Sequence, residues 1–197
     1  MNKKIAITGG IGSGKSAVSN ILRDMSYPVY SCDEIYAEIV KSKSYINEIE
    51  KNFPAAVNQG GIDKKTLAEM VFNNEKERER LNKIAHPLIM QALLKRMNEN
   101  ENQIVFAEVP LLFEGHFENL FEQTIVVLRN REARIRSICA RDNVSRDKAL
   151  ERLNAQFDYD DIQSKNHFQK IGAILIENKG EFSALKNVVE VALKELM

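Results

Sequence analysis

A glycine-rich segment near the start of the chain constrains its fold more than any other feature. Gly9–Ser16 reads GGIGSGKS and satisfies the pattern G-x-x-x-x-G-K-[ST]. A short apolar run, Lys4–Thr8, comes directly before it, and apolar residues spaced three and four apart follow from Lys15 onward. By ordinary residue frequencies, a chance match in a chain of this length falls below roughly one per cent. A strand, this loop and a helix in that order predict a phosphate-binding loop at the edge of an α/β sheet.

Each residue type in this loop has a physical reason. A triphosphate needs a ring of backbone N–H donors, and glycines let the chain curl closely around it. The N-terminus of the following helix adds partial positive charge. We expect Lys15 to reach the β- and γ-phosphates of ATP and the Ser16 hydroxyl to hold the Mg²⁺ that bridges them. The residues predicted to bind the nucleotide here are Gly10, Ile11, Gly12, Ser13, Gly14, Lys15, Ser16 and Ala17.

Short apolar runs rich in isoleucine and valine recur along the chain and alternate with helical patterns. This rhythm is typical of a parallel sheet covered by helices on both faces. Between the second and third runs lie about 70 residues, too many for one connection, and they predict several inserted helices at 34–102. The five predicted strands are Lys4–Thr8, Val29–Cys32, Ile104–Val109, Thr124–Leu128 and Ala173–Ile176.

Composition limits the classes of protein that fit. The 197 residues suggest one domain with an insertion, and 44% apolar residues suffice for a core. Lys plus Arg equals Asp plus Glu at 28 each, so nothing global favours nucleic acid or an anionic membrane. The two cysteines lack disulfide or zinc spacing, and no apolar run approaches the roughly 18 residues of a membrane span. We expect a cytoplasmic protein with reduced cysteines, monomeric or weakly homo-oligomeric, with neither nucleic acid nor membrane as a partner.

Acidic residues follow two of the predicted strands, at the edge where ligands of open α/β sheets bind. Asp33 follows the second strand. It can accept the proton of an acceptor hydroxyl and orient that hydroxyl in line, or it can act as the N-cap of a helix over Glu34–Val40. Glu108 ends the third strand, where it lies either near a metal or its waters, or in a purely structural hydrogen bond. An apolar turn after it either lines an acceptor pocket or packs into the core.

Two later regions also bear on phosphate chemistry. Arginines accumulate over 129–152 within a helical pattern, which favours a surface that meets phosphates. Asn178-Lys179-Gly180-Glu181 comes close to the guanine-reading N-K-x-D pattern but lacks its aspartate, so we interpret Asn178–Gly180 as a strand-end turn. Two classes then remain, a nucleotide-hydrolysing switch or motor and a small-molecule kinase. Asp33 and the arginines favour the kinase.

Taken together, these segments resemble the dephospho-CoA kinase family along nearly the whole chain. The family's opening T-G-G-I-G-S-G-K-S is present as Thr8–Ser16, and its aspartate after the second strand falls on Asp33. The phosphate loop alone is shared by many families, whereas this ordered combination is specific. The other matching segments are Arg80-Leu81 with Ile84 and His86-Pro87, Val109–Glu114, Arg141-Asp142 with Ser145, Arg152 with Ala155-Gln156, and Asn178 with Gly180.

The resemblance implies a P-loop kinase fold, with core 1–33, 103–128 and 158–197, that transfers the ATP γ-phosphoryl group to the ribose 3'-hydroxyl of dephospho-CoA. It implies Asp33 as the general base and the insertion 34–102 as a CoA-binding region, with Arg80 and His86 near the acceptor. It also implies that 129–157 is a lid over ATP in which Arg141 clamps the transferring phosphates. The further contact residues that it implies are Pro110, Leu111 and Leu112 for the acceptor, and Asn178 and Gly180 for the nucleotide.

The chain departs from the family's pattern at several positions. Ser31 and Ala37 stand where the family has an aspartate and an arginine, and Gly172-Ala173 replaces its usual A-D. At the start of the lid helix, Arg134 and Ser137 replace a usual glutamine and arginine. The alternative function is another small-molecule kinase of the same fold, acting on a nucleoside or nucleotide.

Overall fold

The computed structural model describes residues 2–72 and 74–196. The chain folds into two compact units, one formed by 1–30 together with 100–197 and the other by 31–99. The second unit overlaps the predicted insertion but begins before it, so Asp33 belongs to the second unit and not to the sheet unit.

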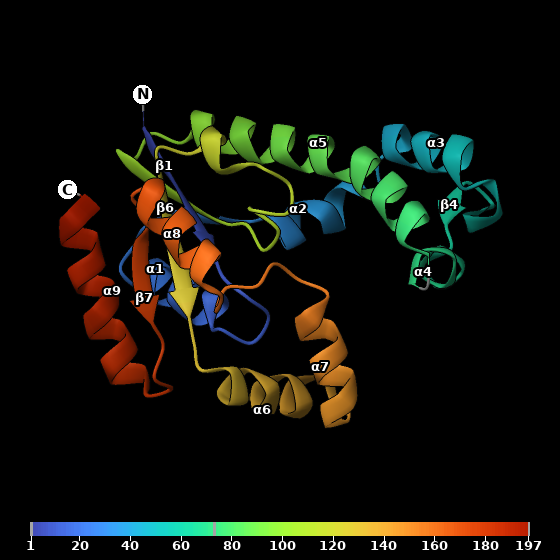
Figure 1. Ribbon diagram of the computed structural model, residues 1–197. Helices are drawn as coiled ribbons and strands as arrows, with labels where there is room; N and C mark the ends of the chain where they lie inside the picture. Colours follow the sequence, from blue (N-terminus) through green and yellow to red (C-terminus); the bar gives the residue numbers. More distant parts are fainter. Residues whose placement is uncertain (1, 73, 197) are drawn as a thin grey trace. The chain divides into compact units, whose positions relative to one another are not determined.

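A five-stranded parallel sheet forms the centre of the first unit, as the apolar runs predict (Figure 1). Its strands are β1 (Lys3–Thr8), β2 (Val29–Ser31), β5 (Ile104–Glu108), β6 (Gln123–Leu128) and β7 (Ile174–Glu177), and every end lies within one residue of the prediction. They lie in the order β2-β5-β1-β6-β7. Because β1 pairs with both β5 and β6, Ile7 lies between Glu108 and Ile125. The phosphate loop therefore leaves the sheet from its central strand, beside Glu108.

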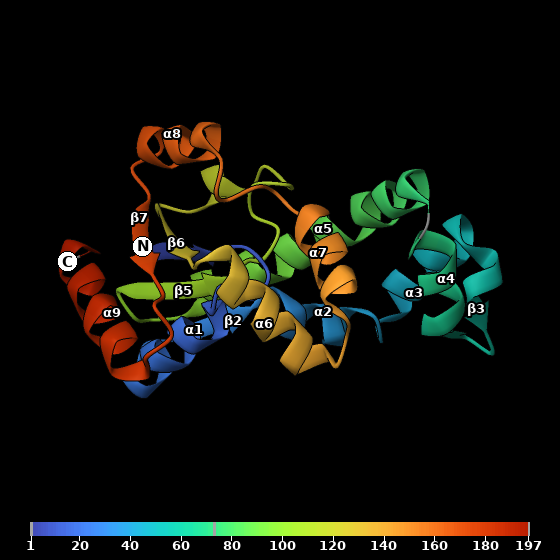
Figure 2. The same ribbon diagram turned by 60° about the horizontal axis from the view of Figure 1, so that its bottom comes forward.

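Helices cover both faces of this sheet. Figure 2 shows α1 (Lys15–Asp24) and α9 (Phe182–Leu196) on one face and α8 (Ile162–Lys170) on the other. Helix α1 begins at Lys15, as predicted, and buries one stripe against the sheet. The main core lies between the sheet and the helices α1 and α9. Its fully buried members include Ile5, Ile7, Val18, Leu22, Phe106 and Ile176.

Two helices follow β6 and form the segment predicted as a lid, α6 (Arg131–Asp142) and α7 (Arg146–Asn154). The Asn130 side chain caps α6 by accepting two backbone N–H groups, and the Ser145 hydroxyl caps α7. The apolar faces of the two helices pack against Ile11 of the phosphate loop. This segment is therefore joined to the loop by side-chain packing as well as by the chain.

The second unit is mainly helical, as the long connection predicts. It contains α2 (Cys32–Ile39), α3 (Lys43–Asn52), a 3₁₀ turn η1 (Pro54–Ala56), α4 (Lys64–Phe72) and α5 (Glu75–Glu99). A hairpin of β3 (Val57–Asn58) and β4 (Gly61–Ile62), which the apolar pattern did not predict, turns through Gln59 and Gly60, both at positive φ. Its own core includes Tyr45, Ile49, Phe53, Ala56, Leu67 and Ala85.

Two expectations from composition concern covalent state and membranes. Cys32 and Cys139, both within the described ranges, are not disulfide-bonded. Over residues 2–72 and 74–196, no helix is both long enough and apolar enough to cross a bilayer.

Candidate active site

The loop between β1 and α1 adopts the conformation that a phosphate cradle requires. Gly9, Gly12 and Gly14 have φ of 148°, 77° and 100°, a region that residues with a Cβ adopt at a cost. Ser13 N–H donates to Gly10 O at 3.1 Å, which closes the turn. The loop leads directly into the N-terminus of α1, where the N-cap Gly14 makes no side-chain cap bond and the helix dipole favours an anion.

Lys15 lies within the loop rather than outside it. Its side chain is nearly buried, and Nζ donates to Gly9 O at 2.7 Å and to Gly10 O at 3.3 Å. The ammonium group is thus held beside the backbone that would surround a phosphate chain. This position is consistent with the predicted role at the β- and γ-phosphates.

Glu108 holds two hydroxyls of α1 at the carboxyl end of β5. Ser16 Oγ donates to Glu108 Oε1 at 2.9 Å and Ser19 Oγ donates to Oε2 at 2.8 Å, with the glutamate only 8% exposed. Of the two interpretations of Glu108 from sequence, the structural hydrogen bond is present, and the metal site stays a prediction. An exposed serine hydroxyl and a carboxylate are oxygen ligands of the kind that Mg²⁺ prefers, so these residues fit that ion.

The turn after β7 contacts the phosphate loop directly. Asn178 Nδ2 donates to Ser13 O at 2.8 Å, and its Oδ1 accepts from Gly180 N–H at 2.9 Å. Gly180 has a φ of 99°. The strand-end turn interpreted from the sequence is therefore present, and it braces the loop through a buried asparagine.

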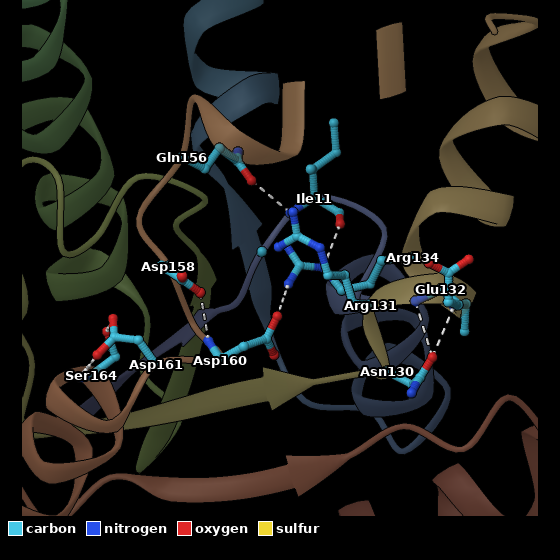
Figure 3. A network of polar contacts seen from close by, with 12 residues as sticks. Ile11, Asn130, Arg131, Glu132, Arg134, Gln156, Asp158, Asp160, Asp161 and Ser164 are labelled. Atoms are coloured by element: carbon cyan, nitrogen blue, oxygen red, sulfur yellow. Dashed lines mark hydrogen bonds and ion pairs between the residues drawn. The ribbon is translucent and has the colours of Figure 1, made fainter. Parts of the chain in front are cut away.

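Sequence reasoning missed the side chains that hold Ile11, which Figure 3 shows from close by. Arg134 Nε donates to Ile11 O at 3.0 Å, while Gln156 Oε1 accepts from Ile11 N–H at 2.7 Å. Burial lowers the pKa of Arg134, and the nearby Asp160 carboxylate opposes that shift. The sequence singled out Arg134 only as a departure from the family's pattern and Gln156 only as part of a matching segment, and neither signal predicts this contact.

Arg141, predicted to clamp phosphates, lies in the last turn of α6 with an exposed side chain. It makes a two-point pair with Asp142, through Nε at 2.7 Å and Nη2 at 3.0 Å, and this bond raises the pKa of Arg141. Asp142 also accepts from Arg152 Nη1 at 2.5 Å. The contact of α6 with the loop described above comes instead from Arg134, which lies about two helical turns before Arg141.

The apolar turn predicted to line an acceptor pocket follows β5 in the first unit. Leu112 is fully buried, whereas Pro110 and Leu111 are half-buried. Phe113 at its end joins Phe157, Tyr159 and Phe168 of α8 in an aromatic cluster, and the 3₁₀ turn η2 (Glu118–Leu120) leads back to β6. The Tyr159 hydroxyl lies 3.1 Å from Thr8 Oγ1, and burial raises the pKa of this tyrosine.

Three predicted substrate residues lie in the second unit. Ser31, not Asp33, caps α2, because Ser31 Oγ accepts the Asp33 N–H at 3.2 Å. The helix-cap interpretation of Asp33 is therefore wrong, and its carboxylate is exposed in the first turn. Arg80 is exposed and donates through Nε to Asn52 Oδ1 at 3.3 Å, and burial lowers the pKa of the half-buried His86.

The sequence of this chain is similar to those of known kinases. The dephospho-CoA kinase family model matches residues 3–183. A dephospho-CoA kinase of Thermus thermophilus is 34% identical over 192 residues, which cover 98% of this chain and 91% of the relative, and one of Fusobacterium nucleatum is 31% identical with 94% of each covered.

Solved structures extend the likeness to the fold. A crystal structure from Thermus thermophilus has a TM-score of 0.83 at 33% identity and covers 100% of this chain and 98% of its own. Dephospho-CoA kinase from Campylobacter jejuni has a TM-score of 0.64 at 25% identity, with 99% and 97% covered. A shikimate kinase from Bacteroides thetaiotaomicron, at 15% identity and a TM-score of 0.51, shares the fold alone. By its phosphate loop, its sheet and its match along residues 3–183, this chain belongs to the dephospho-CoA kinase family.

Proposed function

We propose that this chain transfers the γ-phosphoryl group of ATP to the ribose 3'-hydroxyl of dephospho-CoA, giving CoA and ADP. The observation that carries the proposal is the family match along residues 3–183, in a chain whose loop after β1 has phosphate-binding geometry. The loop and its lysine suit a triphosphate, and the family supplies the acceptor.

Phosphoryl transfer of this kind depends mainly on positioning and on stabilising charge. The segment Gly10–Ser16 would curl around the phosphate chain and offer it backbone N–H donors such as that of Gly12, and Lys15 would add its charge near the γ-phosphate. Its side chain already lies across the loop, at 2.7 Å from Gly9 O, so little side-chain movement is needed. The binding site for ATP is thus largely preorganised by the chain itself.

Ser16 and Glu108 would hold Mg²⁺, which when bound neutralises charge on the β- and γ-phosphates. The Ser16 hydroxyl points at a carboxylate and can turn its oxygen toward a cation. Ser19 keeps the other oxygen of Glu108 in place, at 2.8 Å. This pairing supports a site in which the serine contacts the ion and the glutamate orients the groups around it.

Asp33 would act as the general base. Its carboxylate would accept the proton of the acceptor hydroxyl as the hydroxyl oxygen forms its bond to the γ-phosphorus and the bond to the ADP oxygen breaks. Two facts support this role. The side chain is exposed, and Ser31 takes over the capping of α2, so the carboxylate is not committed to the helix end.

The test is direct. The purified protein is incubated with Mg·ATP and separately with dephospho-CoA, adenosine, a nucleoside monophosphate or no acceptor, while ADP release and the mass of each acceptor are followed. We expect one phosphoryl group to be added to dephospho-CoA alone. Equal ADP release without an acceptor, or phosphorylation of a different acceptor, would contradict the proposal.

The role of Asp33 has its own matched pair of variants. Asp33→Asn should abolish transfer while ATP binding is retained, because only the proton acceptor is removed. Glu34→Gln removes the same charge from the neighbouring exposed position of the same helix turn and serves as the control. An Asp33→Asn enzyme that turns over as fast as the Glu34→Gln enzyme would exclude Asp33 as the base.

A further inference from the structure

Ile11 is held at both its backbone N–H and its backbone C=O by side chains that lie more than a hundred residues away in the sequence. Arg134 Nε, from α6, donates to Ile11 O at 3.0 Å, a contact across 123 residues. Gln156 Oε1, from the segment after α7, accepts from Ile11 N–H at 2.7 Å, across 145 residues (Figure 3). Both hydrogen-bonding groups of one loop residue are thus satisfied by the predicted lid segment.

Arg134 is buried against the phosphate loop. Its side chain is only 3% exposed, and Nη1 lies 3.3 Å from Asp160 Oδ2, which orients the guanidinium plane. A Cβ on Gly10 would collide with Nη2, and a Cβ on Gly12 would lie 2.8 Å from the Arg134 carbonyl oxygen. The glycines therefore serve two purposes, since they shape the phosphate cradle and also let α6 approach it closely.

The position of this contact matters because the loop has little rigidity of its own. Gly10 and Gly12 flank Ile11, and glycine has more backbone freedom than other residues. A rotation of the Ile11 peptide would redirect the N–H of Gly12, one of the donors that faces the phosphates. A bond to each side of Ile11 removes that freedom before ATP arrives.

We propose that Arg134 is a positioning residue for ATP: its Nε hydrogen bond to Ile11 O fixes the Ile11–Gly12 peptide, while Gln156 at Ile11 N–H holds the preceding peptide, so that the loop's remaining N–H donors stay aimed at the phosphates. The hydrogen bond, not the charge, carries the effect. Nearly complete burial beside a carbonyl, with Asp160 balancing the charge, supports this assignment. The inference rests on ATP binding at this loop and does not depend on the identity of the acceptor.

Covalent geometry offers a matched set of variants. The Nε2 of glutamine and the Cε of methionine are the same number of bonds from Cα as the Nε of arginine. Arg134→Gln therefore keeps a donor where Ile11 O needs it but removes the charge and the contact with Asp160. Arg134→Met keeps the chain length up to the position of Nε and removes the donor, and Arg134→Lys keeps the charge but places it one bond further out.

The readout is binding of a non-hydrolysable ATP analogue with Mg²⁺, measured by calorimetry, together with KM and kcat for ATP. We expect Arg134→Met to weaken analogue binding by about 10- to 100-fold, the loss expected when a buried carbonyl oxygen is left without its hydrogen-bond donor. Arg134→Gln should stay within about 3-fold of the unsubstituted protein. The KM for ATP should rise more than kcat falls, and the KM for the acceptor should not change, because the loop binds ground state and transition state alike.

Two further variants complete the design. Gln156→Met removes the opposing acceptor and should weaken analogue binding in the same direction, and it carries the test if Arg134→Met does not fold. Arg136→Gln removes a charge from an exposed position of the same helix and measures the long-range electrostatic contribution.

The outcomes separate the possibilities. Equal losses in Arg134→Gln and Arg134→Met, or recovery in Arg134→Lys alone, would show that the charge acts and would overturn the proposal. Analogue binding unchanged in both Arg134→Met and Gln156→Met would overturn it as well, as would a fall in melting temperature with no change in analogue binding. Because the analogue is measured without any acceptor, failure of the dephospho-CoA reaction would leave this test intact.

Discussion

Replacing Gly14 with alanine tests how closely the phosphate loop fits the turn after β7. Gly14 has a φ of 100°, and an alanine held in the left-handed region costs about 1–2 kcal/mol. Its Cβ would also collide with Asn178 Nδ2, which donates to Ser13 O at 2.8 Å. Displacing this amide leaves a buried polar pair unsatisfied, at a cost of about 1–3 kcal/mol. The free energy of unfolding should therefore fall by about 2–5 kcal/mol in total.

A matched substitution isolates the collision. Gly172 lies in the same unit at a φ of 63°, with nothing within 4 Å of the place where its Cβ would stand. Gly172→Ala should therefore show the backbone cost alone, about 1–2 kcal/mol. Urea unfolding of both variants, followed by circular dichroism, gives the difference, which should be about 1–3 kcal/mol. If Gly14→Ala were no more destabilising than Gly172→Ala, the brace between Asn178 and the loop would not stabilise the fold.

Further predictions concern catalysis, metal and pH. Arg141→Ala should lower kcat by about 100-fold or more with little change in melting temperature, because its pair with Asp142 is exposed; unchanged turnover would remove Arg141 from the mechanism. Glu108→Gln should raise the Mg²⁺ concentration for half-maximal activity by about tenfold at fixed ATP, and an unchanged magnesium titration would contradict its role. Burial lowers the pKa of His86 below its usual 6.5, so the unfolded state binds the proton more readily and stability falls as the pH drops below about 6.5. Urea unfolding at about pH 7.5 and about pH 5.5 should show that the free energy of unfolding falls less in His86→Gln than in the unsubstituted protein. An equal fall in both proteins would refute this assignment.

The local features of this protein are readable in its sequence. The loop Gly9–Ser16, the start of α1 at Lys15 and the ends of all five sheet strands follow from residue types and spacing within short windows. Such features depend on backbone freedom, on the exclusion of apolar side chains from water and on periodicity, all of which act between near neighbours. The helical nature of the long connection after β2 follows for the same reason.

The sequence did not resolve two local features, the residue that caps α2 and the β3–β4 hairpin. Asp33 and Ser31 are both good capping residues, and the helix began earlier than its apolar pattern implied, so that Ser31 became the cap. The β3–β4 hairpin was missed because strands of two residues each are too short to show alternation.

The assembly of the active site depends on contacts between segments that are far apart in the sequence. Ser16 meets Glu108 across 92 residues, Arg134 meets Ile11 across 123, and Asn178 meets Ser13 across 165. No local pattern predicts such pairs, because a hydrogen bond depends on distances and angles that are set only when the sheet, α1 and α6 pack together. Local chemistry thus made the phosphate loop recognisable, and tertiary packing decided which side chains hold it in shape.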